Sequence, residues 1–338
     1  MSTSSIENVS FPFDFPTVYP SLKLSAHFRS YPEDFIVHEE LGFEPSGSGE
    51  HWLLHIEKTG QNTHWVAEQI ALYCGLSLQD VGYCGRKDRH AITSQWFSLY
   101  APKQSDVDWD SLAIEGVTVL SVHRHAKKLR LGSHKANHFS LRLRGVTCEG
   151  ASVSDERQQQ LSVDIQDRLS KGVPNYFGEQ RFGRDKSNLT SAQEWFAQKR
   201  KPHPKRRSMV MSAARSYLFN LLLAERIKQN NWQTPLLGDV LDQNWPTGPL
   251  WGRGRSQVSE CSLSIEEQVF SGLSEELSEW RRGLEYCGLK QERRSLALFP
   301  SNIESSWIGQ DLRLDFTLPV GTYATAVLAE VAELTSDT

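Results

Sequence analysis

Alternating apolar and polar residues in the first third of the chain predict β-strands. A period of two places every second side chain on the same face of a sheet, so four such stretches predict a sheet with one buried face. Their apolar members are Phe35 and Val37; Trp52, Leu54 and Ile56; Val117 and Val119; and Phe139, Leu141 and Leu143.

One helix is predicted among these strands, from about Thr63 to Cys74. Its apolar residues recur every four positions from Val66, which places them on one helical face. Asn62 or Thr63 can cap its first turn, and Gly75 is placed to end it.

The middle of the chain has helical periodicity, and strand alternation returns near the end. A helical block with strands on both sides predicts an α+β protein. The block is either an insertion into a mixed-sheet domain or a separate domain that includes the last strand. Two helices are indicated by apolar residues at helical spacing, and two Glu-rich helical stretches follow between about Ser264 and Tyr286. The apolar residues of the two helices are Leu161, Ile165 and Leu169, and Ala214, Leu218, Leu221 and Leu222; those of the last strand are Leu312, Leu314, Phe316 and Leu318.

Length and composition are those of a globular protein large enough for two domains. The chain has 338 residues, 38% of them hydrophobic and 23% charged, and no apolar run long enough for a transmembrane helix. Met1–Pro20 lacks the basic region and the apolar region that a secretory signal contains, so we do not interpret it as one. The five cysteines form no CxxC pair, so we expect a reducing, cytoplasmic environment.

Charge is segregated along the chain although the net charge is only -4. Gly116–Cys148 contains no acid but seven Lys and Arg residues, and Lys199–Arg207 (KRKPHPKRR) contains six more. The acids concentrate elsewhere, in Glu260–Glu279. These basic runs either form a positive face for a polyphosphate partner or are merely solvated surface.

Several familiar catalytic motifs are missing from the sequence. It contains no HExxH, GxxxxGK[ST] or GxSxG motif. Four histidines, at 123, 125, 134 and 138, are close in sequence but have no Cys or carboxylate among them. Because a metal site needs three or four converging ligands, we expect no metal and interpret these histidines as basic surface.

A single carboxylate, Asp88, lies among cations in Gly82–Ala91 (GYCGRKDRHA). Arg86, Lys87 and Arg89 favour its ionised form. An ionised carboxylate can act as a nucleophile or a base. An Asp after Gly is also common in turns and helix caps, and from spacing alone that structural role is the commoner one.

Two further segments combine aromatic and polar residues. Asn137 and Phe139 fall on the same face if their strand begins by 137, so they could bind the edge and the face of one base. Phe139 could instead begin the core stripe of its strand. Gly172–Asn188 mixes aromatics and cations, which suits either RNA contact or a packed loop.

These segments, in this order, resemble the signature blocks of the TruD family of tRNA pseudouridine synthases. The resemblance runs from about Arg29 to Glu330. The blocks are PEDFIVHEELGFEPSGSGEH, GRKDRHA, KANHFSLRLR, GVPNYFGEQRFG, SAARSYLFN and LPVGTYAT.

The resemblance implies a pseudouridine synthase fold, with an antiparallel mixed sheet and flanking helices. It also implies a mainly helical inserted TRUD domain, and a V-shaped molecule with an RNA cleft. On this basis residues 1–162 and 307–338 form the catalytic domain, and residues 163–306 form the insertion.

The resemblance also implies the reaction, which is isomerisation of uridine 13 in the D stem of tRNA without a cofactor. Asp88 matches the catalytic aspartate. Phe35, Asn137 and Phe139 match the uracil pocket, and Tyr323 stands where other members commonly have Phe. Arg29 stands where a cation is expected beside the carboxylate.

Two other functions compete with this one. An RNA-binding protein or RNA chaperone would bind without turnover, and a glycosylase would release free uracil. For the synthase we expect tRNA as the partner, no membrane association and a monomer.

Overall fold

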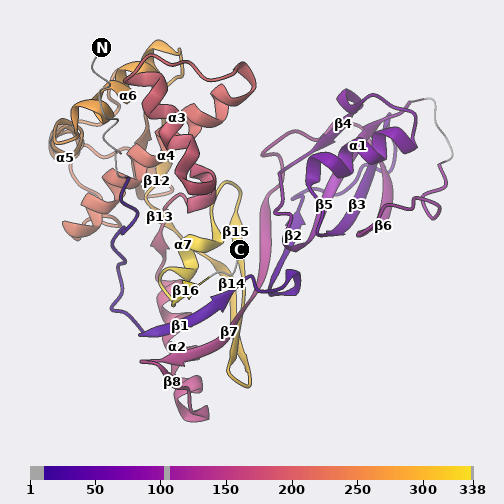
Figure 1. Cartoon of the computed structure of the whole chain (residues 1–338), viewed down its shortest axis with the longest axis horizontal. Coiled ribbons are helices and arrows are strands. Elements are labelled where there is room, and N and C mark those ends of the chain that lie inside the picture. Colours follow the sequence, from indigo (N-terminus) through magenta and orange to yellow (C-terminus); the bar gives the residue numbers. More distant parts are fainter. Residues whose placement is uncertain (1–10, 103–106, 336–338) are drawn as a thin grey trace, which may run out of the picture. The chain divides into compact units, whose positions relative to one another are not determined.

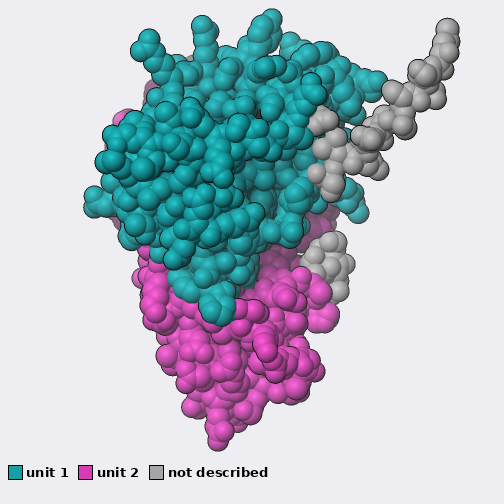
Figure 2. All heavy atoms as spheres, turned by 90° about the vertical axis from the view of Figure 1, so that its left-hand side faces the viewer, with its two compact units in different colours: residues 1–20, 172–298, 325–330 teal, residues 21–171, 299–324, 331–338 magenta. Residues whose placement is uncertain are grey.

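The computed structural model describes residues 11–102 and 107–335 of the chain, and these fall into two compact units. Unit 1 comprises residues 1–20, 172–298 and 325–330, and unit 2 comprises residues 21–171, 299–324 and 331–338. Figure 2 shows the two units in different colours. The domain boundaries inferred from the sequence, after 162 and 306, stay a prediction. The absence of a secretory signal was predicted from Met1–Pro20, and residues 1–10 of that segment lie outside the described ranges.

Unit 2 is built on an 11-stranded mixed sheet (Figure 1). Its main path runs β14-β15-β7-β2-β5-β3-β6, with β2 and β5 parallel and the other neighbours antiparallel. The strands on this path are β2 (Phe35–Glu40), β3 (His51–Thr59), β5 (Ile92–Tyr100), β6 (Val117–His125), β7 (Ala136–Cys148), β14 (Ser301–Ile308) and β15 (Asp311–Pro319). Four short strands extend the sheet: β1 (Leu24–Phe28), β4 (Val81–Tyr83), β8 (Ala151–Ser152) and β16 (Glu333–Thr335).

The four strands predicted from alternation are present as β2, β3, β6 and β7. The last strand, β15, pairs with β7 from Leu312 to Pro319 and therefore joins the same sheet as the N-terminal strands. β5 was not predicted, because it is buried on both faces between β2 and β3 and so has no alternating pattern.

Two helices belong to unit 2. α1 (Thr63–Tyr73) begins and ends as predicted, since the Asn62 side chain accepts a hydrogen bond from the backbone N–H of His64, and Gly75 has a φ of 64°. Its apolar face, which includes Val66 and Ile70, packs on Leu54 and Ile56 of β3. α2 (Asp155–Ser170) packs on β14, and Trp307 donates a hydrogen bond to Ser162.

Unit 1 is mainly helical. Its helices are α3 (Ser187–Phe196), α4 (Pro204–Lys228), α5 (Glu260–Ser271) and α6 (Glu275–Tyr286). Short strands accompany them: β9 (Val173–Pro174), β10 (Leu241–Asp242), β11 (Trp245–Leu250), β12 (Glu292–Ser295) and β13 (Ala297–Leu298). α7 (Ala324–Leu328) follows β15. Among the described residues no helix is both long enough and apolar enough to cross a membrane.

The aromatic segment at 172–188 is a packed loop. Phe177 and Phe182 are buried, and the Tyr176 hydroxyl donates a hydrogen bond to the backbone carbonyl of Pro16. Lys186 donates a hydrogen bond to the backbone carbonyl of Phe11. Among the cations of this segment, only Arg184 has an almost fully exposed side chain. The structure therefore favours the packing interpretation of this segment.

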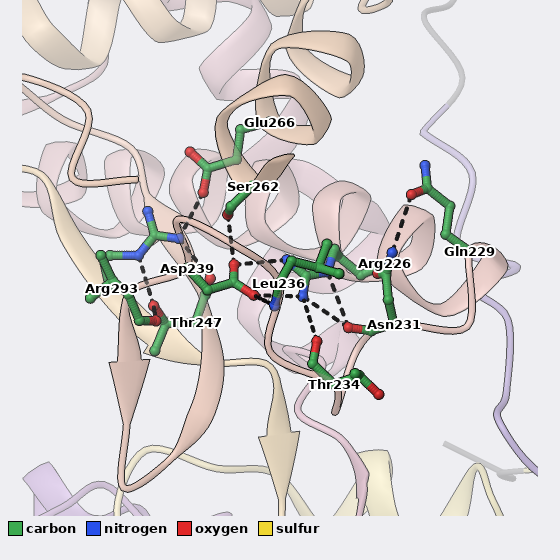
Figure 3. A network of polar contacts seen from close by, with 11 residues as sticks. Arg226, Gln229, Asn231, Thr234, Leu236, Asp239, Thr247, Ser262, Glu266 and Arg293 are labelled. Atoms are coloured by element: carbon green, nitrogen blue, oxygen red, sulfur yellow. Dashed lines mark hydrogen bonds and ion pairs between the residues drawn. The ribbon is translucent and has the colours of Figure 1, made fainter. Parts of the chain in front are cut away.

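A buried network of charges organises the interior of unit 1 (Figure 3). Arg226 makes two hydrogen bonds of 3.0 Å to the two carboxylate oxygens of Asp239, and both side chains are almost completely inaccessible. Ser262 and the backbone N–H of Leu236 also donate to Asp239. Burial favours the neutral acid, but these hydrogen bonds together lower the pKa of Asp239 below its ordinary value.

We predict that Asp239→Asn destabilises the protein by about 3–5 kcal/mol, because it leaves the Arg226 charge buried without a counter-charge. Chemical denaturation followed by tryptophan fluorescence measures the change. Asp242→Asn, on the exposed strand β10, is the control and should change stability by less than about 0.5 kcal/mol. Equal stability of the two variants would contradict a stabilising role for the network.

Candidate active site

Asp88 lies in the loop between β4 and β5, and three anchors fix that loop to β3, α1 and their connection. Lys58 Nζ donates to the backbone carbonyl of Asp88 at 2.8 Å. Thr63 Oγ1 accepts from the backbone N–H of Lys87, and Arg89 Nε donates to the carbonyl of Gly60, both at 3.0 Å. The Asp88 side chain remains 39% exposed, so a well-anchored backbone presents an accessible carboxylate.

Arg29 connects the Asp88 carboxylate to the aromatic residues of the sheet. Its Nη2 donates to Asp88 Oδ2 at 3.0 Å, and its guanidinium lies 4.1 Å from the ring centroid of Phe35. Burial lowers the pKa of Arg29, while the negative charge of Asp88 acts in the opposite direction. The cation expected beside the carboxylate is thus present, and it packs between Asp88 and Phe35.

The aromatic residues lie on one face of the central strands. Phe139 pairs with Val37 of β2 and with Phe316 of β15, and its ring stacks on Phe316 with centroids 5.6 Å apart. Phe35 meets Phe139 edge to face, with centroids 6.1 Å apart. Phe35 is only 4% exposed, whereas Phe139 is partly accessible. Phe139 is therefore the better placed of the two to contact a ligand.

Asn137 is held by a buried ion pair. Lys87 Nζ donates a hydrogen bond to Asn137 Oδ1 at 2.5 Å and forms an ion pair with Glu39, with 2.8 Å between Nζ and Oε2. Glu39 lies directly opposite Asn137 in the β2–β7 pairing, and its other oxygen accepts from the backbone N–H of Trp96. An ammonium group only donates hydrogen bonds, so Lys87 fixes the oxygen of the Asn137 amide and leaves the NH₂ group directed elsewhere.

His134 lies beside this ion pair and is buried. Neither ring nitrogen has a partner in good hydrogen-bond geometry within the described part of the chain, although the nearby Asn137 side chain acts to raise the pKa of the ring. Burial lowers the pKa of His134, and the charges of Glu39 and Lys87 act on it in opposite directions. The interpretation of His134 as basic surface was therefore wrong, because its ring is enclosed by the β4–β5 loop and the start of β7.

The other three histidines have separate surroundings. His138 contacts Glu40 and Thr317, His125 stacks on Phe43, and His123 contacts Ser121. Within residues 11–102 and 107–335, no group of three or more His, Cys, Asp or Glu side chains could hold a metal ion.

Tyr323 lies in the turn between β15 and α7 and is partly exposed. Its assignment to the uracil pocket stays a prediction, as do the assignments of Phe35, Asn137, Phe139 and Asp88. The residues that sequence reasoning missed are Glu39 and Lys58. One signal was present for Glu39, because the alternation of Phe35 and Val37 continues to position 39 and places an acid on the buried face.

Comparisons with known proteins identify the family. Residues 21–199 match the family described as tRNA pseudouridine synthase D (TruD). The chain belongs to the TruD family. It is 46% identical to the tRNA pseudouridine synthase D of Cellvibrio japonicus, with 96% of this chain and 94% of the relative covered. It is 40% identical to that of Methylococcus capsulatus, with 95% and 94% covered.

A solved structure has the same fold. It is described as the putative tRNA pseudouridine synthase D (TruD) from Methanosarcina mazei, with a TM-score of 0.65, 21% identity and 94% of each chain covered. This likeness confirms the predicted α+β fold with a mixed sheet and flanking helices. Family membership makes this chain a tRNA pseudouridine synthase, an isomerase that acts on uridine in tRNA.

For this TruD-family enzyme, we predict that Lys58 gives stability a specific pH dependence. Burial lowers the pKa of Lys58 from 10.5 to about 8. Between these values the unfolded chain holds a proton that the folded chain has lost. The free energy of unfolding should therefore rise between pH 8 and pH 10.5, by up to about 1.4 kcal/mol per pH unit from this group. Below pH 8 the lysine is protonated in both states, so this group adds no pH dependence there.

Lys58→Met isolates this contribution. Denaturant unfolding of both proteins between pH 7 and pH 10 should give a stability difference that is constant below pH 8 and grows in favour of the wild type above it. A difference that is the same at every pH would show that Lys58 titrates normally in the folded protein.

Proposed function

We propose that this enzyme isomerises the uridine at position 13, in the D stem of tRNA, with Asp88 as its catalytic carboxylate and without a cofactor. The family supports the reaction class, and the resemblance of the signature blocks supports the position and the aspartate. The observation that carries the proposal is the ion pair of Asp88 with Arg29, on a loop tied to buried groups.

The chemistry needs no redox partner. The N1–C1′ bond breaks, the uracil turns, C5 bonds to C1′, and the proton lost from C5 is balanced by one gained at N1. Substrate and product are isomers, so one positioned carboxylate is sufficient in principle. Asp88 attacks C1′ or C6, or removes the proton at C2′, and each role requires an ionised and accessible oxygen. The Arg29 pairing favours that ionised form.

The target base has to leave its stack to reach Asp88, which costs a few kcal/mol. Stacking on aromatic side chains can recover about 1–3 kcal/mol per base. The accessible ring of Phe139 supports such a contact, and Tyr323 would supply a second. Phe35 would act through Arg29, which covers its ring.

The orientation of Asn137 supports recognition of uracil. With its oxygen bound to Lys87, the amide offers a donor, and the uracil edge offers two carbonyl acceptors. Cytosine has an amino donor where uracil has O4, so a fixed donor at that point would repel it. The ion pair of Lys87 with Glu39 would then serve substrate selection as well as packing.

The proposal also includes tRNA as the partner, no membrane association, a monomeric enzyme and a cytoplasmic location. All five cysteines are free thiols, which supports a reducing environment.

We predict that Asp88→Asn abolishes turnover while tRNA binding persists, because the amide can neither attack carbon nor accept the proton. Tritium release from tRNA labelled at uridine C5 measures turnover, and filter binding measures affinity. Chromatography of the digested wild-type product should show pseudouridine and no abasic site. A variant that turns over at nearly the wild-type rate would remove Asp88 from the mechanism.

We also predict that Lys87 acts through Asn137. Asn137→Ala should lower kcat/KM by about ten- to a hundredfold, because it removes one hydrogen bond to the base. The double change Glu39→Gln, Lys87→Met removes both buried charges together and should lower kcat/KM by a similar factor by freeing the amide to rotate.

A double-mutant cycle tests the connection. In the Asn137→Ala background, the Glu39→Gln, Lys87→Met change should add little further loss. Multiplicative losses would show that the ion pair supports the site independently of Asn137. Thermal denaturation of each variant checks that the comparison is made between folded proteins.

A further inference from the structure

Unit 1 contains a pocket of about 770 Å³ lined by residues of α3, α4 and α6, none of which belongs to the site around Asp88. Its volume falls within the range of about 300–1,000 Å³ that is usual for ligand sites. Part of the basic run Lys199–Arg207 lines this pocket, so the structure gives that run a specific location.

Aromatic side chains form part of the pocket wall. Trp195 and Phe196 stack with ring centroids 4.9 Å apart and are largely buried. α6 approaches them closely at Gly283, where a Cβ atom would lie only 2.2 Å from Phe196 Cδ1. Tyr286, the last residue of α6, differs from them because 95% of it is exposed. A tyrosine so placed offers an open ring face at the pocket.

The cations of the pocket divide into paired and unpaired groups. Glu279 accepts hydrogen bonds from Lys199 at 3.1 Å and from Arg282 at 2.7 Å, which neutralises part of their charge. In the part of the chain that the structure describes, neither Lys201 nor Arg207 pairs with a carboxylate. Arg207 Nε donates to the carbonyl of Pro202, which orients its guanidinium.

Both unpaired cations act on the same point of the pocket. Burial raises the pKa of the Cys287 thiol, and the positive charges of Lys201 and Arg207 oppose that increase. Cys287 follows Tyr286 directly, and both residues line the pocket together with Lys201 and Arg207. The pocket thus combines two cations that pair with no carboxylate of the described chain with one exposed aromatic ring.

We propose that this pocket binds one unpaired nucleotide of the tRNA substrate, with its phosphate on Lys201 and Arg207 and its base on Tyr286. The inference rests on the proposed function only in taking tRNA as the partner. Phosphate pairing and base stacking are the two interactions by which proteins bind single-stranded nucleotides. The nucleotide is unpaired because a base within a helix already stacks on its neighbours. It is distinct from the uridine that reacts at Asp88.

The chain offers a matched control for this pocket. Lys205 and Arg206 belong to the same basic run and to the first turn of α4, but they are exposed and do not line the pocket. We therefore compare two double variants that remove equal charge from neighbouring positions. The pocket pair is Lys201→Ala with Arg207→Ala, and the control pair is Lys205→Ala with Arg206→Ala. A general electrostatic attraction would respond equally to both changes.

The experiment measures the affinity of a full-length Asp88→Asn protein for an unmodified tRNA transcript by filter binding at several salt concentrations. The pocket pair should weaken binding by about tenfold or more and make the affinity less dependent on salt, whereas the control pair should weaken it by less than about threefold. Tyr286→Ala should weaken binding by about tenfold, and Tyr286→Phe should retain it. Because Tyr286 is exposed, its substitution leaves the fold intact.

Two results would overturn the inference. One is an equal loss of affinity in the pocket pair and the control pair, and the other is wild-type affinity in Tyr286→Ala. These outcomes differ from failure of the proposed function. Tritium release by Asp88→Asn would contradict the mechanism alone, and lack of tRNA binding by the unsubstituted protein would contradict the proposed substrate.

Discussion

Two buried lysines fix the loop that carries Asp88 to the central sheet. Lys58 binds the backbone carbonyl of Asp88, and Lys87, the preceding residue, binds Glu39 and Asn137. An ammonium group loses most of its hydration when it is buried, and it recovers that free energy only through such hydrogen bonds. If the loop moved away from the sheet, the buried Lys58 and Glu39 side chains would lose these partners. This constraint holds the Asp88 carboxylate beside Arg29 and Phe35.

The same constraint connects the proposed catalytic carboxylate to the proposed base-binding residues. Asp88 and Lys87 are neighbours in sequence, and their side chains take different directions, one to Arg29 and the other to Asn137. A displacement of the loop would disturb both contacts at once. The proposed nucleophile or base and the proposed reader of the uracil edge thus share one rigid support, which is what preorganisation of a site requires.

Buried ion pairs appear in both units but serve different ends. The Arg226–Asp239 pair in unit 1 joins α4 to the loop that carries Asp239, and Ser262 joins α5 to the same carboxylate. The Lys87–Glu39 pair in unit 2 lies next to Asn137, the proposed reader of the uracil edge. Because desolvation offsets much of the attraction within a buried pair, retention of such a pair near a site is better explained by orientation than by stability.

The sequence by itself determined the strands β2, β3, β6 and β7, the helix α1 with both its ends, and the cationic surroundings of Asp88, because these depend on local periodicity and on neighbours along the chain. The resemblance to a family added the reaction. Only the tertiary structure decided that β5 lies within the sheet between β2 and β3, since burial on both faces removes alternation. It also decided that Glu39 meets Lys87, that His134 is enclosed, and that Lys201 and Arg207, but not Lys205, line a pocket with Tyr286. Such contacts join residues far apart in sequence, and no local pattern encodes them.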